Sequence, residues 1–187
     1  WLDTLLAALD TGFDIANGLH NRLAHIPALA ERADRLGRQL VDVRYPEVEL
    51  EVGHAHPRTG QRLLTVGTDC SCGKMFTSLA MEREMHARER KATFRATGQT
   101  GILIAGTGIS VDAVIADFIA GATEQLAPAN AANHWDMIEG QGSLFHASYA
   151  GVSMGLLHGA QAHALILCHE PTRTHMRGLP EAALPSL

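Results

Sequence analysis

Residues 63–77 read Leu63-Leu64-Thr65-Val66-Gly67-Thr68-Asp69-Cys70-Ser71-Cys72-Gly73-Lys74-Met75-Phe76-Thr77. The stretch predicts a buried strand, a tight loop and the first turn of a helix. Small residues at Gly67 and Gly73 allow the backbone to bend so that successive N–H groups point into one concavity, and Lys74 adds a positive charge at a helix N-terminus. This geometry binds phosphate, so we expect residues 67–75 to hold the phosphates of a ligand.

The composition is that of an ordinary soluble globular protein, with 46% hydrophobic and 19% charged residues in a chain of 187. The formal net charge of −5, without a cluster of Lys and Arg, argues against a nucleic-acid partner. No apolar run reaches membrane-spanning length, which argues against a membrane protein. Three cysteines, two of them in the loop at 67–75, predict a reducing cytoplasm and no disulfide framework.

From Arg62 onward the sequence predicts alternating strands and helices. The predicted strands are 63–66, 92–96, 134–138 and 162–168, and the predicted helices are 74–89, 111–126 and 147–158. Such alternation predicts an α/β fold with a doubly wound, mostly parallel sheet of the P-loop NTPase type. The unusual loops are 67–73, 97–101, 139–146 and 169–178. Each comes directly after a predicted strand, so we expect all of them at the carboxyl edge of the sheet, where ligands bind.

The first part of the chain predicts a separate unit. Helical periodicity covers residues 1–16 and 27–40, and short strands are predicted at 15–19 and at 41–44. We therefore expect residues 1–44 to end an N-terminal domain, residues 45–61 to be a linker, and residues 62–187 to form a P-loop domain that is incomplete at its C-terminus. Because both ends are abrupt, we expect a piece of a longer chain.

The predicted phosphate loop differs from the common ATP-hydrolysing pattern. Met75 stands where a Ser or Thr normally ligates Mg²⁺, and a thioether is a poor ligand for a hard cation. The loop is therefore better suited to hold a pyrophosphate than to cleave one. Its five residues between Gly67 and Gly73 resemble the loop of dethiobiotin synthetase and related P-loop ligases. The segment at 139–142, Glu-Gly-Gln-Gly, resembles the Glu-Gly-Ala-Gly of those enzymes.

Seven segments together resemble the D-glutamate N-acetyltransferase (DgcN) family of P-loop proteins. They are residues 66–71, 73–75, 96–102, 111–114, 117–118, 139–143 and 169–173. The resemblance covers nearly the whole chain and implies that residues 1–44 are the end of a Rossmann-like domain. It also implies transfer of an acetyl group from acetyl-CoA to the amine of D-glutamate, with the phosphate loop anchoring the coenzyme without hydrolysis.

Acyl transfer needs a base for the substrate ammonium and hydrogen-bond donors for the tetrahedral oxyanion. We expect the base to be Glu139 or His146, followed by Asp69 and then His169, and the donors to be backbone amides of residues 140–143. The alternative for Glu139 is an acid that orders Mg²⁺ or caps a loop. The alternative for His146 is a cap or a surface residue.

The two carboxylates of D-glutamate call for fork-shaped donors. Arg95 lies on the strand beside the loop, and Arg173 and Arg177 lie in the segment after the last strand, all at the expected ligand edge. Arg173 is the first choice. Gln99 and Ser143 complete the expected substrate-binding set. The alternative is that the segment holding Arg173 is a solvated loop.

Other interpretations remain open on the sequence alone. Cys70 and Cys72 allow a thiol nucleophile or a zinc site, but a closed zinc site needs four ligands, so we expect no metal. A P-loop ligase that uses Mg-ATP and a non-catalytic nucleotide-binding module are the alternative functions. A symmetric homo-oligomer is the default expectation for the assembly.

Overall fold

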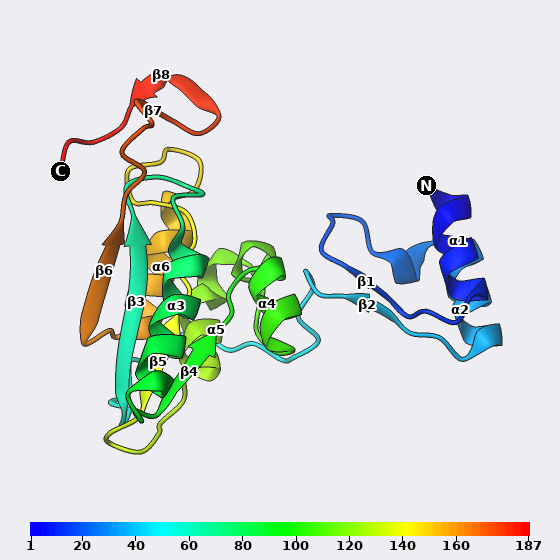
Figure 1. Cartoon of the computed structure of the whole chain (residues 1–187), viewed down its shortest axis with the longest axis horizontal. Coiled ribbons are helices and arrows are strands. Elements are labelled where there is room, and N and C mark those ends of the chain that lie inside the picture. The colour runs from blue at the N-terminus through cyan, green and yellow to red at the C-terminus, as the bar shows by residue number, and fades with distance from the viewer.

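The structure, a computed structural model, describes residues 1–187 and contains a small N-terminal unit and a larger α/β unit (Figure 1). The N-terminal unit consists of α1 (Leu2–Asp10), β1 (Ile15–Asn17), a 3-10 turn (Leu23–His25), α2 (Pro27–Leu36) and β2 (Leu40–Asp42). β1 and β2 pair in parallel. A core of its own, formed by Leu9, Leu23, Leu29 and Ala33, holds this unit together.

The larger unit is built on a four-stranded parallel sheet, which confirms the predicted α/β fold. Its strands are β3 (Gln61–Gly67), β4 (Ala92–Arg95), β5 (Trp135–Ile138) and β6 (Ala164–Cys168), in the order β4-β5-β3-β6. A short helix, α4 (Gln99–Ala105), follows β4, and a C-terminal hairpin consists of β7 (His175–Met176) and β8 (Leu179–Ala183). Figure 1 shows the hairpin beyond the carboxyl ends of β3 and β6.

Helices cover both faces of this sheet. α3 (Lys74–Ala87) lies on one face, where Met81 and Met85 pack against a buried cluster of Leu63, Ala92 and Met137. α5 (Ile119–Leu126) and α6 (Ala150–Ala160) lie on the other face, over the cluster that contains Leu64 and Ile138. No helix in the structure is long and apolar enough to cross a membrane.

Both helices expected in the N-terminal unit are shorter than predicted. α1 ends at Asp10 because Gly12 takes a φ of +94°, and α2 ends at Leu36 because Gly37 adopts the left-handed conformation with a φ of 61°. The residues that follow each helix then enter β1 and β2, so the periodicity at 11–16 and 37–40 belongs to other structure.

The prediction of one helix over residues 111–126 is wrong. Two 3-10 turns, Val111–Ala113 and Ala116–Phe118, precede α5, and Val114 and Ile115 between them have extended backbone angles. The chain is held here because the N–H of Val111 donates to the carbonyl of Thr97. The expected start of the following helix is also early, since α6 begins at Ala150.

Candidate functional site

The loop between β3 and α3 presents unpaired backbone donors. Ser71 and Gly73 have positive φ values of 52° and +97°, which turn the chain tightly before Lys74 begins α3. The N–H groups of Ser71, Cys72 and Gly73 donate to no protein atom. Successive free amides at a helix N-terminus form a concavity that can bind an anion, which is the geometry expected of a phosphate loop.

The Lys74 side chain lies across this loop. Its Nζ donates to the carbonyl of Asp69 at 2.8 Å and lies 3.6 Å from the Sγ of Cys72. A Cβ at Gly67 would be 2.9 Å from that Nζ and 2.5 Å from that Sγ, closer than packed atoms come. The absence of a side chain at Gly67 therefore allows the cation to reach the floor of the loop.

An ion pair between Arg173 and the buried carboxylate of Asp69 holds the loop in place. Arg173 Nη1 lies 2.5 Å from Asp69 Oδ2 and 2.7 Å from the carbonyl of Cys70, and the N–H of Arg177 donates to the same carboxylate at 2.9 Å. Burial alone would raise the pKa of Asp69, but these donors hold it below its ordinary value. Asp69, a predicted base, is thus a fixed anion, and Arg173, the predicted substrate contact, is bound to the loop.

Replacing Arg173 with glutamine is expected to lower the free energy of unfolding at pH 7 by about 2 to 3 kcal/mol, because the Asp69 anion loses its cation. The lowered pKa of Asp69 means that this stabilisation is complete above the unfolded pKa of about 4 and is lost as the pH falls further. Urea unfolding of parent and variant from pH 7 to pH 2 checks this. Arg83, which is exposed and bonded to nothing, gives the control Arg83→Gln; a stability gap for Arg173→Gln that did not narrow in acid would contradict the assignment.

Glu139 joins the ends of β4 and β5. Its Oε2 accepts the N–H groups of Thr97 at 2.8 Å and Gly98 at 3.1 Å, and its Oε1 accepts from Gln141 Nε2 at 3.1 Å. The residue is 3% exposed, and burial raises the pKa of its carboxyl group despite these donors. The loop-capping interpretation therefore describes its contacts, while the raised pKa is the property that a general base requires.

His146 has no free ring nitrogen. Its Nε2 donates to the carbonyl of Arg177 at 3.0 Å, and its Nδ1 accepts the N–H of Ser148 at 3.2 Å. The ring is 1% exposed. These bonds connect the loop after β5 to the C-terminal hairpin, so in this arrangement His146 positions backbone.

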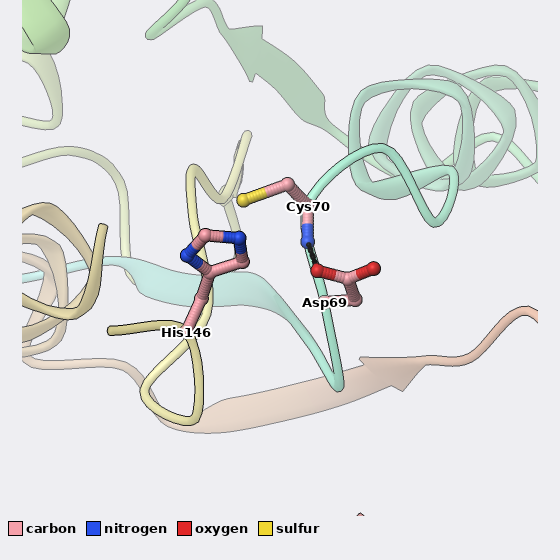
Figure 2. A group of neighbouring side chains, drawn as sticks. All are labelled: Asp69, Cys70 and His146. Atoms are coloured by element: carbon pink, nitrogen blue, oxygen red, sulfur yellow. Dashed lines mark hydrogen bonds between the residues drawn. The ribbon is translucent and has the colours of Figure 1, made fainter. Parts of the chain in front are cut away.

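Asp69, Cys70 and His146 converge behind the loop, and Figure 2 shows the Cys70 thiol pointing toward the imidazole. One ligand atom from each lies within 4.8 Å of the others, a spacing that suits a metal ion. However, both oxygens of Asp69 already accept hydrogen bonds, and the guanidinium of Arg173 is adjacent. Hydrogen bonding within the protein accounts for the cluster. Burial raises the pKa of the Cys70 thiol, which weakens it as a nucleophile.

The remaining predicted substrate residues are occupied by protein partners. Arg95 Nε donates to Asp136 at 2.8 Å, and Gln99 Nε2 donates to both carboxylate oxygens of Asp112 at 3.1 Å. Ser143 is 2% exposed, and its hydroxyl accepts the N–H of Phe145. The structure therefore does not bring these three side chains together at one ligand.

The amides expected to bind the oxyanion divide into two groups. The N–H of Gly140 donates to Thr65 Oγ1 at 3.0 Å and is therefore unavailable. The N–H groups of Gln141 and Gly142 donate to no protein atom. Gly142 has a φ of 63°, which orients this turn.

A cavity of about 940 Å³ lies beside the phosphate loop. Its lining includes Lys74, Glu139 and Arg177 from the α/β unit, and His20 and Arg44 from the N-terminal unit. Sequence reasoning missed the contribution of the N-terminal unit, because nothing local marks those residues. Asp112 also lines the cavity, and its Oδ2 pairs with Arg44 Nη1 of the N-terminal unit at 2.7 Å. The only feature of the sequence that pointed to Asp112 is its place in segment 111–114, which carries the family resemblance.

Two family models match the chain along most of its length. Residues 50–187 match the domain of unknown function DUF1611_C, described as a P-loop domain, and residues 1–46 match DUF1611_N, described as a Rossmann-like domain. The chain belongs to the DUF1611 family. A crystal structure of a DUF1611 family protein from Anabaena variabilis has a TM-score of 0.90 and 38% identity, covering 99% of this chain and 54% of that one.

Two curated relatives of this DUF1611 chain carry the name D-glutamate N-acetyltransferase. The protein from Tritonibacter scottomollicae is 62% identical and that from a Pseudoalteromonas species is 50% identical, each over all 187 residues. In both cases the alignment covers 56% of the relative, so the chain spans about half the length of the curated relatives it matches. The predicted resemblance to the DgcN family is confirmed.

Proposed function

We propose that this protein transfers the acetyl group of acetyl-CoA to the amine of D-glutamate. The observation that carries the proposal is the 62% and 50% identity to relatives named D-glutamate N-acetyltransferase, in matches that cover all 187 residues of this chain. Three free cysteines fit the reducing cytoplasm that we propose as its location.

In this proposal the phosphate loop holds the coenzyme. The free amides of Ser71 to Gly73 and the Lys74 cation supply donors for its phosphates. Met75 follows Lys74, and the nearest downstream hydroxyl, Thr77 Oγ1, lies 3.5 Å from Cys168 Sγ instead of facing the loop. The loop thus lacks the hydroxyl that positions Mg²⁺ for ATP cleavage, which favours phosphate anchoring over the Mg-ATP ligase alternative.

The chemistry requires a neutral amine at the acetyl carbonyl. Glu139, which lines the cavity with a raised pKa, accepts the proton of the substrate ammonium. The amine nitrogen then forms a bond to the carbonyl carbon, the bond from that carbon to the coenzyme sulfur breaks, and the second proton of the nitrogen passes to the departing thiolate, which leaves as the free thiol. The free amides of Gln141 and Gly142 donate to the oxyanion that forms between these events.

The direct test is to incubate the purified protein with acetyl-CoA and D-glutamate and to follow free thiol with a chromogenic disulfide, with N-acetyl-D-glutamate confirmed by mass spectrometry. We expect thiol release that depends on both substrates. Parallel reactions with ATP, Mg²⁺ and D-glutamate measure phosphate release. Phosphate release without acetyl transfer would replace the proposal with the ligase alternative, and no turnover in either reaction would leave a binding module.

Replacing Lys74 with alanine is expected to weaken coenzyme A binding roughly 10- to 100-fold, because one charge-assisted contact to phosphate is lost. Isothermal titration with coenzyme A measures the change. Arg83→Gln, which removes a cation far along α3, serves as the control and should bind as the parent does. A Lys74→Ala protein with parental affinity would remove the phosphate-anchoring claim.

A further inference from the structure

We propose that the guanidinium of Arg177 binds a carboxylate of the amino-acid substrate in the cavity beside the phosphate loop. This inference rests on the proposed acetyl transfer to D-glutamate. The inference assigns substrate recognition to Arg177 instead of Arg173, because the guanidinium of Arg173 is already bonded to Asp69 and to the carbonyl of Cys70.

The backbone of Arg177 is held on both sides. Its N–H donates to Asp69 Oδ2 at 2.9 Å, and its carbonyl accepts from His146 Nε2 at 3.0 Å. The neighbouring Met176 is buried, and Gly178 turns the hairpin with a φ of +79°. The Cα of Arg177 is therefore fixed next to the phosphate loop, and its side chain projects from a rigid support.

The side chain of Arg177 has no partner in the protein, although it lines the cavity. It makes none of the side-chain hydrogen bonds or ion pairs of the structure. Of the other cationic side chains of the cavity, Lys74 is assigned to the coenzyme phosphates, and Arg44 pairs with Asp112. Arg177 is thus the guanidinium that can receive an anion from the cavity without breaking an existing bond.

The chemistry of the two ligands decides which anion it receives. The coenzyme phosphates already have the amides of Ser71 to Gly73 and Lys74. The amino-acid substrate brings two carboxylates, and a guanidinium binds a carboxylate through two parallel N–H···O bonds. Because the predicted alternatives Arg95 and Arg173 are bound to Asp136 and Asp69, Arg177 is assigned to the substrate.

The test compares Arg177→Gln with the parent in steady-state acetyl transfer. We expect the KM for D-glutamate to rise roughly 10- to 100-fold and the KM for acetyl-CoA to stay within about twofold, because one charge-assisted pair to one substrate is lost. The thermal midpoint should not change, since the guanidinium makes no hydrogen bond or ion pair with the protein. Arg83→Gln, an exposed arginine outside the cavity, is the matched control.

Calorimetric titration of D-glutamate in the presence of coenzyme A makes the test independent of turnover. Binding by the parent that is lost in Arg177→Gln supports the inference. Equal D-glutamate affinity in the two proteins overturns it, as does a variant whose KM rises for acetyl-CoA instead. A parent that binds D-glutamate through Arg177 but does not acetylate it would contradict the proposed function alone, and a parent that binds no D-glutamate would overturn both.

Discussion

Glu139→Gln is expected to lower kcat for acetyl transfer roughly 10²- to 10⁴-fold, the usual contribution of a positioned general base. Glutamine keeps one oxygen to accept the N–H groups of Thr97 and Gly98, and its NH2 group loses only the bond from Gln141 Nε2, so the loop that Glu139 caps should persist. The variant cannot, however, take a proton from the substrate ammonium. Pre-steady-state and steady-state thiol release measure the loss, and thermal unfolding shows whether the loop has kept its support.

The pH profile separates a base from a purely structural carboxylate. Burial raises the pKa of Glu139, so the parent should lose activity as the pH falls through a value above that of an ordinary glutamate, because the base becomes protonated there. Glu139→Asp should retain such an acidic limb at reduced kcat, and Glu139→Gln should lose it. A Glu139→Gln enzyme within tenfold of the parent, with the limb intact, would show that another group is the base.

Gly140→Ala is expected to destabilise the protein by about 3 kcal/mol or more. A Cβ at Gly140 would overlap the carbonyl oxygen of Thr65 in the central strand β3, and backbone cannot move aside as a flexible side chain can. The N–H of Gly140 also donates to Thr65 Oγ1, so a shifted loop would leave a buried donor without its partner. Urea or thermal unfolding measures the effect.

Gly151→Ala in α6 is the matched control for this substitution. A Cβ there meets nothing within 4 Å, and alanine is favoured over glycine in a helix, so this variant should be equal to the parent or more stable by up to about 1 kcal/mol. The two variants differ from the parent by the same methyl group. Equal stability of Gly140→Ala and the parent would mean that the loop after β5 is not packed against β3.

Local signals in the sequence were sufficient for the fold. The apolar run before Gly67, the glycines of the loop and the helical pattern after Lys74 specify a strand, a turn and a helix over adjacent residues, and the structure has β3, the loop and α3 in that order. The helix predicted at 111–126 failed for a non-local reason. Val111 is bonded to Thr97 and Asp112 is bonded to Arg44, and these tertiary contacts outweigh the helical periodicity of the segment.

Less of the site could be predicted from the sequence. The sequence places charged residues at the ligand edge of the sheet, but it does not show which protein groups they bond to. Arg173 and Arg177 are equivalent by position after β6, yet the guanidinium of Arg173 pairs with Asp69, whereas Arg177 bonds to Asp69 only through its backbone N–H and its guanidinium has no partner. The sequence predicts His146 as a base, but in the structure both of its ring nitrogens are hydrogen-bonded to backbone groups. Which cation is paired with protein is a property of three-dimensional contacts, and no spacing rule encodes it.

The carboxylate of Asp112 connects the two units of the chain. It accepts from Arg44 of the N-terminal unit and from Gln99, the first residue of α4. Gln99 directly follows Gly98, whose amide is held by Glu139. A continuous series of bonds therefore joins Arg44 of the N-terminal unit, through Asp112 and the adjacent residues 98 and 99, to the carboxyl group beside the cavity. The two units meet at this series of bonds, so the N-terminal unit helps to hold the backbone donors that surround Glu139.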